Sequence, residues 1–499
     1  MEIHIPSLVL CISFFIFFKI VSKLKTKTSN RKHLPLPPGP WKLPLIGNLH
    51  NLVGALPHHT LRRLSRKFGP MMSLQLGELS AVIISSADAA KEIMKTHDLN
   101  FASRPQVAAA DIIGYGSTNI TFSPYGGHWR QLRKICTLEL LSAKRVQSFR
   151  PLRERVFVDL CRRFADHGSS AVNFSEEFMS ATYTLISRAV LGEEAEQHEG
   201  LLPNVKEMPE LTAGFDISEV FPSVGLFKVM SRLRKRIVAV HKDTDRILDD
   251  VIHQHRAAKS EEHKDLLDVL LQLQEDGLEL PLTDENIKSV LVDMLVAGSE
   301  TSSTVIEWAM AEMLKNPRIL EKAQEEVRRV FDKEGTVDES HIHELKYLKS
   351  VVKETLRVHP PAPLILPRIC GETCEINGYE IPAETKIIVN AWAVNRDPKY
   401  WEDSDCFKPE RFLDNLVDFR GNHFQYIPFG AGRRMCPGIG FGLANVELPL
   451  AMFMYHFDWE LDGGMKPQDL DMEEKFGASA KKLKDLFLIP AIKRTLPTK

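Results

Sequence analysis

The stretch "PFGAGRRMCPG", residues 428–438, decides the fold because it places one cysteine in a setting with no second cysteine nearby. The glycines around it permit tight turns and let the backbone approach another group closely. Pro437 and Gly438 are followed by a run with helical periodicity. Cys436 is therefore predicted at the N-terminal end of a helix, where the dipole and free amides favour a thiolate with a lowered pKa.

A thiolate in a loop of bare backbone amides suits a single axial bond to haem iron. On spacing alone, an inert buried cysteine remains the alternative. A nucleotide loop is excluded, because the segment has no G-x-G-x-x-G pattern. The seven cysteines are scattered and odd in number, which argues against a disulfide framework. The net charge of −2 argues against a nucleic-acid partner.

The N-terminus differs from the rest of the chain. Residues 5–21, "IPSLVLCISFFIFFKIV", are almost wholly apolar, and a basic cluster without acids follows them. Because the charges come after the apolar run and no A-x-A-like cleavage site is present, a cleaved signal peptide is disfavoured. We expect a single transmembrane anchor within residues 1–33, with everything beyond it in the cytosol. The proline-rich "LPLPPGP", residues 34–40, then predicts a stiff link.

No linker or repeat divides residues 34–499, which are interpreted as one large domain. Helical periodicity dominates, with a long helix expected from about 283 to 314. Alternation over 69–86 and 379–397 predicts short strands. The expected fold class is mainly α with a small separate β part.

The segment 429–438 resembles the cysteine-loop signature F-x-x-G-x-R-x-C-x-G of the cytochrome P-450 superfamily, the haem-thiolate monooxygenases, at every fixed position. Other motifs of that family appear in order. The resemblance implies haem b with Cys436 as its iron ligand, and Phe429 and Arg434 as cofactor contacts. Glu354 and Arg357 in "KETLR", with Arg411 of "PERF", match a structural network beneath the haem.

The motif "AGSETS", residues 297–302, lies inside the expected long helix. By resemblance, Glu300 and Thr301 form the acid–alcohol pair that delivers protons to dioxygen. Gly298 in a helix interior costs about 1 kcal/mol of helix stability relative to Ala, so its presence there requires a structural or functional explanation. We interpret it, with Ala297, as opening a groove over the iron.

Haem carries two propionates, which require cations and hydrogen-bond donors. Trp129 and Arg133 are four residues apart on one helix face and match the family's W-x-x-x-R propionate contacts. Arg368 in "LILPR" matches a further contact. The exposed-looking Arg130 and Lys134 are interpreted either as solvated side chains or as part of a patch for a reductase.

The proline link, the anchor and the cysteine loop most resemble the plant microsomal branch, in the seventy-one clan, close to its terpenoid hydroxylases. The resemblance implies an endoplasmic-reticulum membrane enzyme that receives NADPH electrons through a flavoprotein reductase. Its pocket segments are mainly apolar, with Asp111 and Asp293 as the only charges, which favours a neutral hydrophobic substrate. Ala362, Ile365 and Ala478 are predicted to line the pocket.

The expected function is hydroxylation or oxidation of a mono-, sesqui- or diterpenoid. A flavonoid or alkaloid hydroxylase of the same class remains an alternative. So do a haem-thiolate isomerase or dehydratase that uses no dioxygen, and a non-enzymatic haem sensor. Haem-thiolate isomerases and dehydratases tend to lose the acid–alcohol pair, whereas Glu300 and Thr301 are both present in this sequence.

Overall fold

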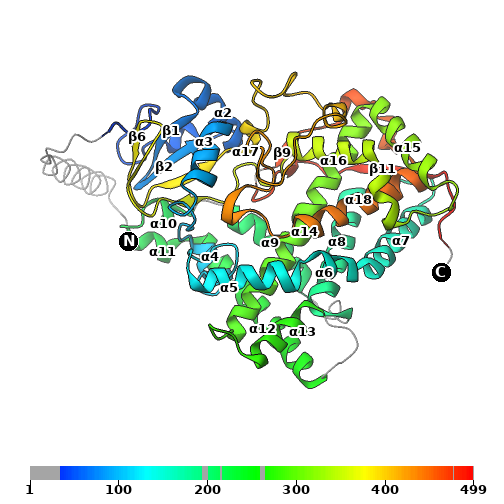
Figure 1. Cartoon of the computed structure of the whole chain (residues 1–499), viewed down its shortest axis with the longest axis horizontal. Helices are drawn as coiled ribbons and strands as arrows, with labels where there is room; N and C mark the ends of the chain where they lie inside the picture. Colours follow the sequence, from blue (N-terminus) through cyan, green and yellow to red (C-terminus); the bar gives the residue numbers. More distant parts are fainter. Residues whose placement is uncertain (1–33, 194–199, 214–215, 259–264, 476, 498–499) are drawn as a thin grey trace, which may run out of the picture.

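The computed structural model describes residues 34–193, 200–213, 216–258, 265–475 and 477–497. Its described part is mainly helical, as the sequence predicts, and its strands form small sheets. The helices, with the labels of Figure 1, are α2 (Pro57–Phe68), α3 (Ala87–Lys91), α4 (Ala108–Ile113), α5 (Gly127–Ile135), α6 (Ala143–Ser148), α7 (Arg150–Asp166), α8 (Phe174–Leu191), α9 (Leu201–Ala213), α10 (Ile217–Val220), α11 (Gly225–Met230), α12 (Arg232–Ala258), α13 (Leu266–Asp276), α14 (Asp284–Lys315), α15 (Pro317–Phe331), α16 (Lys346–Val358), α17 (Ala391–Val394) and α18 (Ile439–His456). The strands are β1 (Met71–Leu76), β2 (Leu79–Ile84), β3 (Val172–Asn173), β4 (Arg368–Ile369), β5 (Cys374–Ile376), β6 (Tyr379–Ile381), β7 (Lys386–Val389), β8 (Phe457–Leu461), β9 (Glu474–Lys475), β10 (Lys481–Lys482) and β11 (Phe487–Ile492).

The largest sheet has the strand order β1-β2-β7-β4. β1 and β2 form an antiparallel hairpin, which confirms the strand pair predicted over 69–86. β2 runs parallel to β7, and β7 pairs antiparallel with β4. The strands predicted over 379–397 are confirmed as β6 and β7, but the segment after them turns into α17.

The β part is not one separate unit, which corrects the expectation from sequence. A second sheet, of order β3-β11-β8, packs against α7 and α8, away from the sheet at the N-terminal end in Figure 1. β3 is only two residues long. A strand of that length carries no readable alternation, so the sequence pattern could not reveal β3.

Helix α14 is the central element of the fold. The helix predicted over 283–314 is confirmed with bounds Asp284–Lys315. Thr283 caps its start in a capping box with Asn286, which satisfies amides of the first turn. At 1.5 Å per residue, its 32 residues span about 48 Å.

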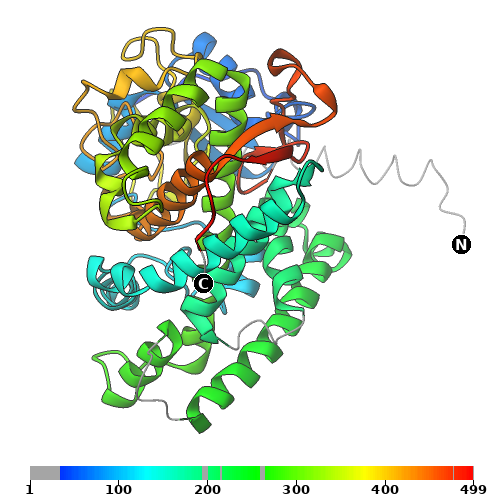
Figure 2. The same ribbon diagram turned by 90° about the vertical axis from the view of Figure 1, so that its right-hand side faces the viewer.

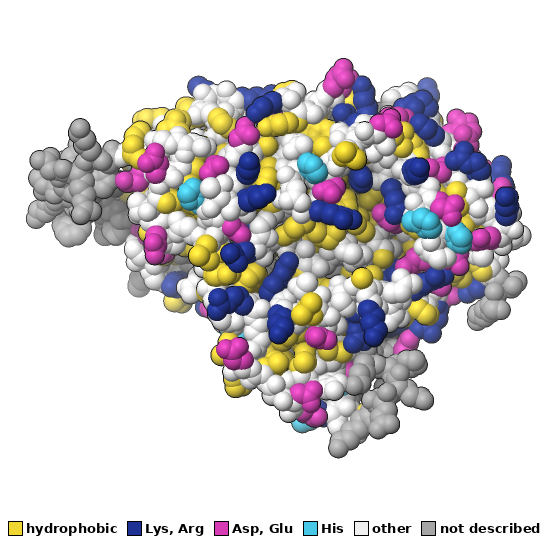
Figure 3. Space-filling model, in the orientation of Figure 1, with side chains coloured by type: hydrophobic (Ala, Val, Ile, Leu, Met, Phe, Trp, Pro, Cys, Tyr) yellow, Lys and Arg dark blue, Asp and Glu magenta, His cyan; other side chains and the backbone are white. Residues whose placement is uncertain are grey.

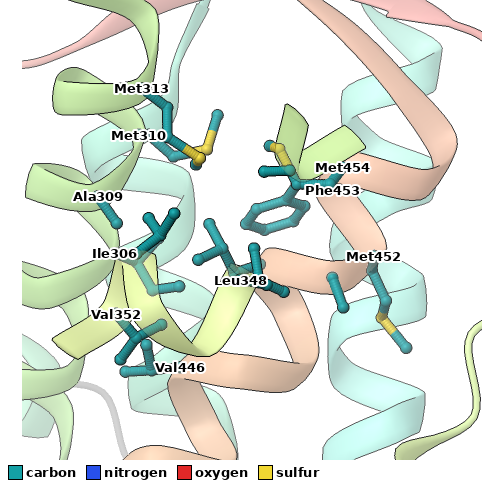
Figure 4. Close-up of a cluster of buried hydrophobic side chains, with 14 of the residues drawn as sticks. Ile306, Ala309, Met310, Met313, Leu348, Val352, Val446, Met452, Phe453 and Met454 are labelled. Atoms are coloured by element: carbon teal, nitrogen blue, oxygen red, sulfur yellow. The ribbon is translucent and has the colours of Figure 1, made fainter. Parts of the chain in front are cut away.

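Apolar side chains of α14, α16 and α18 point toward one another in Figure 4 and form part of the main hydrophobic core. Most residues of α14 are buried, which identifies it as a core helix rather than a surface one. In Figures 1 and 2, α12 and α13 form the lower edge of the molecule. The cysteine loop leads directly into α18, so the same packing that buries α14 also fixes the end of that loop.

A buried ion pair holds α16 to the segments that precede the cysteine loop. The guanidinium of Arg357 donates to both carboxylate oxygens of Glu354, at 2.8 Å each, and both side chains are fully buried. Arg411 Nε donates to the same carboxylate at 3.0 Å. The network predicted from "KETLR" and "PERF" is therefore confirmed.

The surface carries both signs of charge. Figure 3 shows Lys and Arg side chains across the middle and lower part of one face, interspersed with Asp and Glu. Arg130 and Lys134 are exposed on α5, and their contact with a reductase stays a prediction. The predicted anchor lies outside the described residues. Among the helices that the structure describes, none is long and apolar enough to cross a membrane.

Candidate active site

The cysteine loop, residues 428–438, is held by backbone hydrogen bonds to itself and to its surroundings. The N–H of Cys436 donates to the carbonyl of Phe429 at 3.1 Å, which closes the loop. Arg368 Nη2 donates to the carbonyl of Ala431 at 2.8 Å, and the N–H of Arg433 donates to Asp98 at 2.8 Å. These bonds fix the loop without any side-chain bond to the sulfur.

Gly432 packs tightly against another segment of the chain. Its φ is +72°, in the left-handed region that favours glycine. A Cβ built on Gly432 would lie 2.1 Å from the carbonyl oxygen of Met94, a backbone atom that cannot move aside cheaply. The glycine is therefore required by the backbone path as well as by the space available.

Cys436 lies two residues before the N-cap of α18, which is Gly438. Burial raises the pKa of the Cys436 thiol, while the N–H of Gly438 and the charge of Arg133 act in the opposite direction. The predicted lowering of this pKa by the protein alone is therefore wrong, because desolvation outweighs the amide and the cation. A bound metal ion would hold this sulfur deprotonated.

Three predicted cofactor contacts lie in the loop or near it. Arg434 is buried and donates to the backbone carbonyls of Ala102, at 2.6 Å, and of Ser123. Arg133 is near enough to Cys436 for the two charges to affect each other's pKa. Phe429 packs edge-on against Phe419, with ring centroids 5.2 Å apart.

Trp129 stays a predicted haem contact, and the structure shows two protein contacts of its indole ring. Its indole N–H donates to the carbonyl of Ile120 at 3.0 Å, and the guanidinium of Arg434 lies over its ring at 4.3 Å. In this structure the N–H that the resemblance assigns to a propionate already has a protein partner. Trp129 therefore orients Arg434 through its ring face.

Arg104 joins this group, although sequence reasoning missed it. It is buried and donates to the carbonyls of Thr121, Leu366 and Pro367. Burial and the charges of Arg368 and Arg434 lower its pKa well below the usual range. The only signal in the sequence was its place in "FASRPQ", which matches none of the motifs considered above.

The arginine cluster fits a haem. Burial lowers the pKa of Arg434 to about 9, and the neighbouring Arg368 and Arg133 lower it further in the same direction. Arg368 pairs with Asp98 at 2.9 Å, yet its Nε is buried without a partner among the described residues. Excess buried positive charge beside a soft sulfur is the donor set that haem propionates and haem iron require.

Helix α14 presents Ala297, Glu300 and Thr301 to a cavity of about 390 Å³. Thr301 Oγ1 donates to the carbonyl of Ala297 at 2.7 Å, which leaves its lone pairs facing the cavity. Glu300 Oε2 lies 2.6 Å from the ammonium of Lys481, a partner that no sequence motif indicated. Burial raises the pKa of Glu300, and Lys481 lowers it.

Gly298 does not face the cavity, which corrects its interpretation as part of a groove. A Cβ at this position would lie 3.1 Å from Cδ1 of Ile186 on α8. The glycine therefore lets α8 pack closely against α14. Ala297 is the small residue that lines the cavity.

The cavity is mainly apolar, and Ala362, Ile365 and Ala478 line it as predicted. Ile365 has a φ of +44°, which is rare for a β-branched residue and occurs where the surrounding structure imposes it. Its Cγ2 lies 3.8 Å from the position of a Cβ on Gly430, so the cavity and the cysteine loop share a wall.

The charges in the cavity differ from the prediction. Asp111 is exposed on α4 and does not line the cavity. Asp293 lines it, accepts hydrogen bonds from Asn119 at 2.8 Å and the N–H of Thr121 at 3.0 Å, and has a pKa raised by burial to about 6. Sequence reasoning missed three further charged residues that line the cavity: Glu219, Lys386 and Lys475.

A protein that offers haem one soft sulfur ligand, a cationic wall for its carboxylates and an apolar space beside them belongs to the haem-thiolate class. Comparison with known proteins narrows this class to a family. The family model described as Cytochrome P450 matches residues 37–487, so the chain belongs to the cytochrome P450 family. Members of this family are monooxygenases that bind haem b and receive electrons from NADPH through a reductase.

Among similar proteins, desmethyl-deoxy-podophyllotoxin synthase of Sinopodophyllum hexandrum is 52% identical over 478 residues, which cover 94% of each chain. Premnaspirodiene oxygenase of Hyoscyamus muticus is 50% identical and covers 96% of this chain and 97% of its own. Tabersonine 6,7-epoxidase isoform 1 of Catharanthus roseus is 47% identical over 98% of both. A zebra fish cytochrome P450 solved with progesterone has a TM-score of 0.74 at 23% identity, covering 88% of this chain and all of that one, and supports the fold alone.

The close approach at Gly432 predicts a specific sensitivity. Gly432→Ala should strongly reduce haem incorporation, because its Cβ would collide with the carbonyl of Met94. The control is Gly463→Ala, which has a similar φ of +63° but no atom within 4 Å of the new Cβ. Haem content per polypeptide measures the effect. Equal haem content in the two variants would contradict the steric argument.

Proposed function

We propose that this protein oxidises a hydrophobic plant terpenoid of mono-, sesqui- or diterpene size, most simply by hydroxylation. The observation that carries the proposal is the apolar cavity of about 390 Å³ that shares a wall with the cysteine loop. Apolar lining with few polar groups favours a neutral hydrophobic ligand. The similarity to premnaspirodiene oxygenase supports this substrate class.

When bound, haem supplies the activation of dioxygen, with electrons from NADPH through the reductase. The chain's own residues do the rest. Cys436 would ligate the iron through its sulfur, and Arg368 and Arg434 would bind the propionates. The apolar cavity positions the substrate and excludes water from the reacting carbon.

Glu300 and Thr301 are proposed to move protons. Thr301 lines the cavity and holds its own proton toward the carbonyl of Ala297, so its oxygen can accept a proton or order a water. Glu300 lines the same cavity, and Lys481, its partner, lines a second, polar cavity of about 220 Å³. The Glu300–Lys481 ion pair therefore lies between the two cavities and offers a route by which Glu300 regains a proton from solvent.

The competing substrate classes remain flavonoids and alkaloids, and the similarity to tabersonine 6,7-epoxidase favours the second. Expression of the full chain in microsomes with a plant reductase, fed a panel of terpenes, flavonoids and alkaloids, separates the three. The terpenoid proposal expects NADPH-dependent oxygenated terpene products. Turnover of an alkaloid or flavonoid, with no terpene converted, would overturn it.

Cys436→Ser tests the proposed iron ligand. A serine oxygen is a harder ligand with a much higher pKa, so this variant should lose the strongly red-shifted Soret band of the reduced, carbon-monoxide-bound thiolate form, and lose monooxygenation with it. The matched control is Cys370→Ser, because Cys370 is a buried free cysteine between β4 and β5 whose thiol already donates to the carbonyl of Glu372 at 3.1 Å. A retained band in Cys436→Ser would show that another residue ligates the iron.

Thr301→Ala tests proton delivery. The variant should keep its haem but consume NADPH mostly to release hydrogen peroxide, with product formation reduced by a factor of about 10² or more. Thr301→Ser keeps the hydroxyl and should restore most of the coupling. Product formed per NADPH is the measured quantity. Wild-type coupling in Thr301→Ala would remove this side chain from the mechanism.

We propose that residues 1–33 anchor the protein in the endoplasmic reticulum membrane, with residues 34–499 as one domain in the cytosol. The support is the apolar run at 5–21 and the basic cluster that follows it. Deletion of residues 1–33 should move much of the protein from the microsomal pellet to the carbonate-extracted fraction while preserving its carbon-monoxide spectrum. Protease protection of residues 34–499 in intact microsomes would contradict the orientation.

A further inference from the structure

Lys386, in the wall of the cavity, has no partner among the residues that the structure describes. Lys386 lies on β7 and is held on both sides, opposite Ala81 of β2 and Ile369 of β4. Its side chain is half-buried and lines the cavity. Its ammonium makes no ion pair within 4.0 Å and no hydrogen bond with any residue that the structure describes.

Glu219, on α10, faces the same cavity. One of its carboxylate oxygens, Oε1, accepts a hydrogen bond from the N–H of Ala108 at 2.6 Å. Its position is fixed further, because the next residue, Val220, accepts a backbone hydrogen bond from Glu78 in the β1–β2 turn at 2.9 Å. Its other oxygen, Oε2, has no hydrogen bond to a residue of the described chain.

Lys386 and Glu219 influence each other without touching. Burial lowers the pKa of Lys386 and raises that of Glu219, and each charge opposes the shift of the other. Their separation exceeds the 4.0 Å of an ion pair. A long lysine side chain usually extends to water or pairs with an acid when it is partly buried. Here a rigid strand holds the ammonium at an apolar cavity, where an unmatched donor is costly.

The remaining lysines of this region behave differently. Lys475 also lines the cavity, but its ammonium pairs with Glu210 at 2.6 Å. Lys481 pairs with Glu300 at 2.6 Å. Among the described lysines that line the cavity, Lys386 therefore offers a donor that is still free for a ligand.

We infer that Lys386 and Glu219 form a polar anchor for a hydroxyl oxygen on an otherwise apolar substrate. The oxygen accepts a hydrogen bond from the Lys386 ammonium, and its O–H donates to Oε2 of Glu219. Both bonds can form at about 2.7–3.0 Å if the oxygen lies between the two groups. A net neutral donor–acceptor pair suits a hydroxyl better than a carboxylate, because an anion would be opposed by Glu219.

This inference rests on the proposed function and narrows it. The substrate is a terpenoid alcohol rather than a terpene hydrocarbon. An earlier step must then supply the hydroxyl, either by oxygenation of the hydrocarbon or by capture of water during its cyclisation.

The test uses the purified, haem-loaded full chain and an optical titration of the spin-state change on ligand binding, which does not depend on turnover. The probes are matched pairs of three sizes: limonene and carveol, δ-cadinene and α-cadinol, and abietadiene and abietadienol. The measured quantity is the ratio of alcohol to hydrocarbon affinity. We expect this ratio to fall about tenfold or more in Lys386→Met for the scaffold that binds, since a lost hydrogen bond in an apolar site has that size.

Two controls isolate the effect. Lys386→Arg keeps a donor on β7 and should keep most of the ratio. Lys475→Met removes a lysine from the same cavity whose charge is already paired, and should leave the ratio unchanged. The carbon-monoxide spectrum checks that each variant keeps its thiolate-bound haem.

An unchanged ratio in Lys386→Met would overturn the inference, and so would an equal loss of affinity for alcohol and hydrocarbon, which indicates a structural role. In both cases binding of terpenes would leave the proposed function standing. If no terpene or terpene alcohol changes the spin state of the wild-type protein, the terpenoid proposal itself fails, and this inference fails with it.

Discussion

The buried ion pair between Glu354 and Arg357 is the constraint on which the cysteine loop depends. Two fully buried charges are stable only when their remaining hydrogen-bonding groups are also satisfied. Arg357 meets this condition by donating to the carbonyl of Asn395 at 3.0 Å, and the side chain of Asn395 in turn accepts the N–H of Ile427 at 3.0 Å. Ile427 directly precedes the loop. The charge pair on α16 thus fixes, through two hydrogen bonds, the point where the cysteine loop begins.

Two further contacts fix the loop, one a hydrogen bond and the other a close packing of backbone against backbone. Arg368 binds the carbonyl of Ala431, and Gly432 lies against the backbone at Met94. Arg368 also belongs to a cluster with Arg104 and Arg434 that has more positive charges than neighbouring acids. Each of these neighbours has a pKa lowered by burial and by the charge of Arg368. The protein therefore uses the same guanidinium groups to hold its own backbone and to create a positive site, so loss of one of them should affect both folding and cofactor retention.

Residues with a motif were predictable from the sequence, and residues defined by the packing of distant segments were not. Cys436, the Glu354–Arg357–Arg411 network and the course of α14 follow from short patterns and periodicity. At Cys436 the N–H of Gly438 does lower the pKa of the thiol, but desolvation raises it by more, and no local sequence pattern contains the extent of burial. Gly298 shows the same limit. Its cost in a helix was predictable, whereas its neighbour Ile186 comes from a helix more than a hundred residues earlier.

Lys481 and Lys386 show why the missed residues matter for chemistry. Both are lysines on short strands near the cavity, and no sequence motif marks either of them, although the strand that carries Lys386 was predicted. Their surroundings nevertheless assign them different roles. Lys481 is already paired with Glu300, so its charge controls the protonation of that acid. Lys386 has no such partner in the described part of the chain, so its donor is free there for a ligand. Under the two proposals above, the compensated charge of Lys481 serves proton transfer, and the uncompensated charge of Lys386 serves recognition of the substrate.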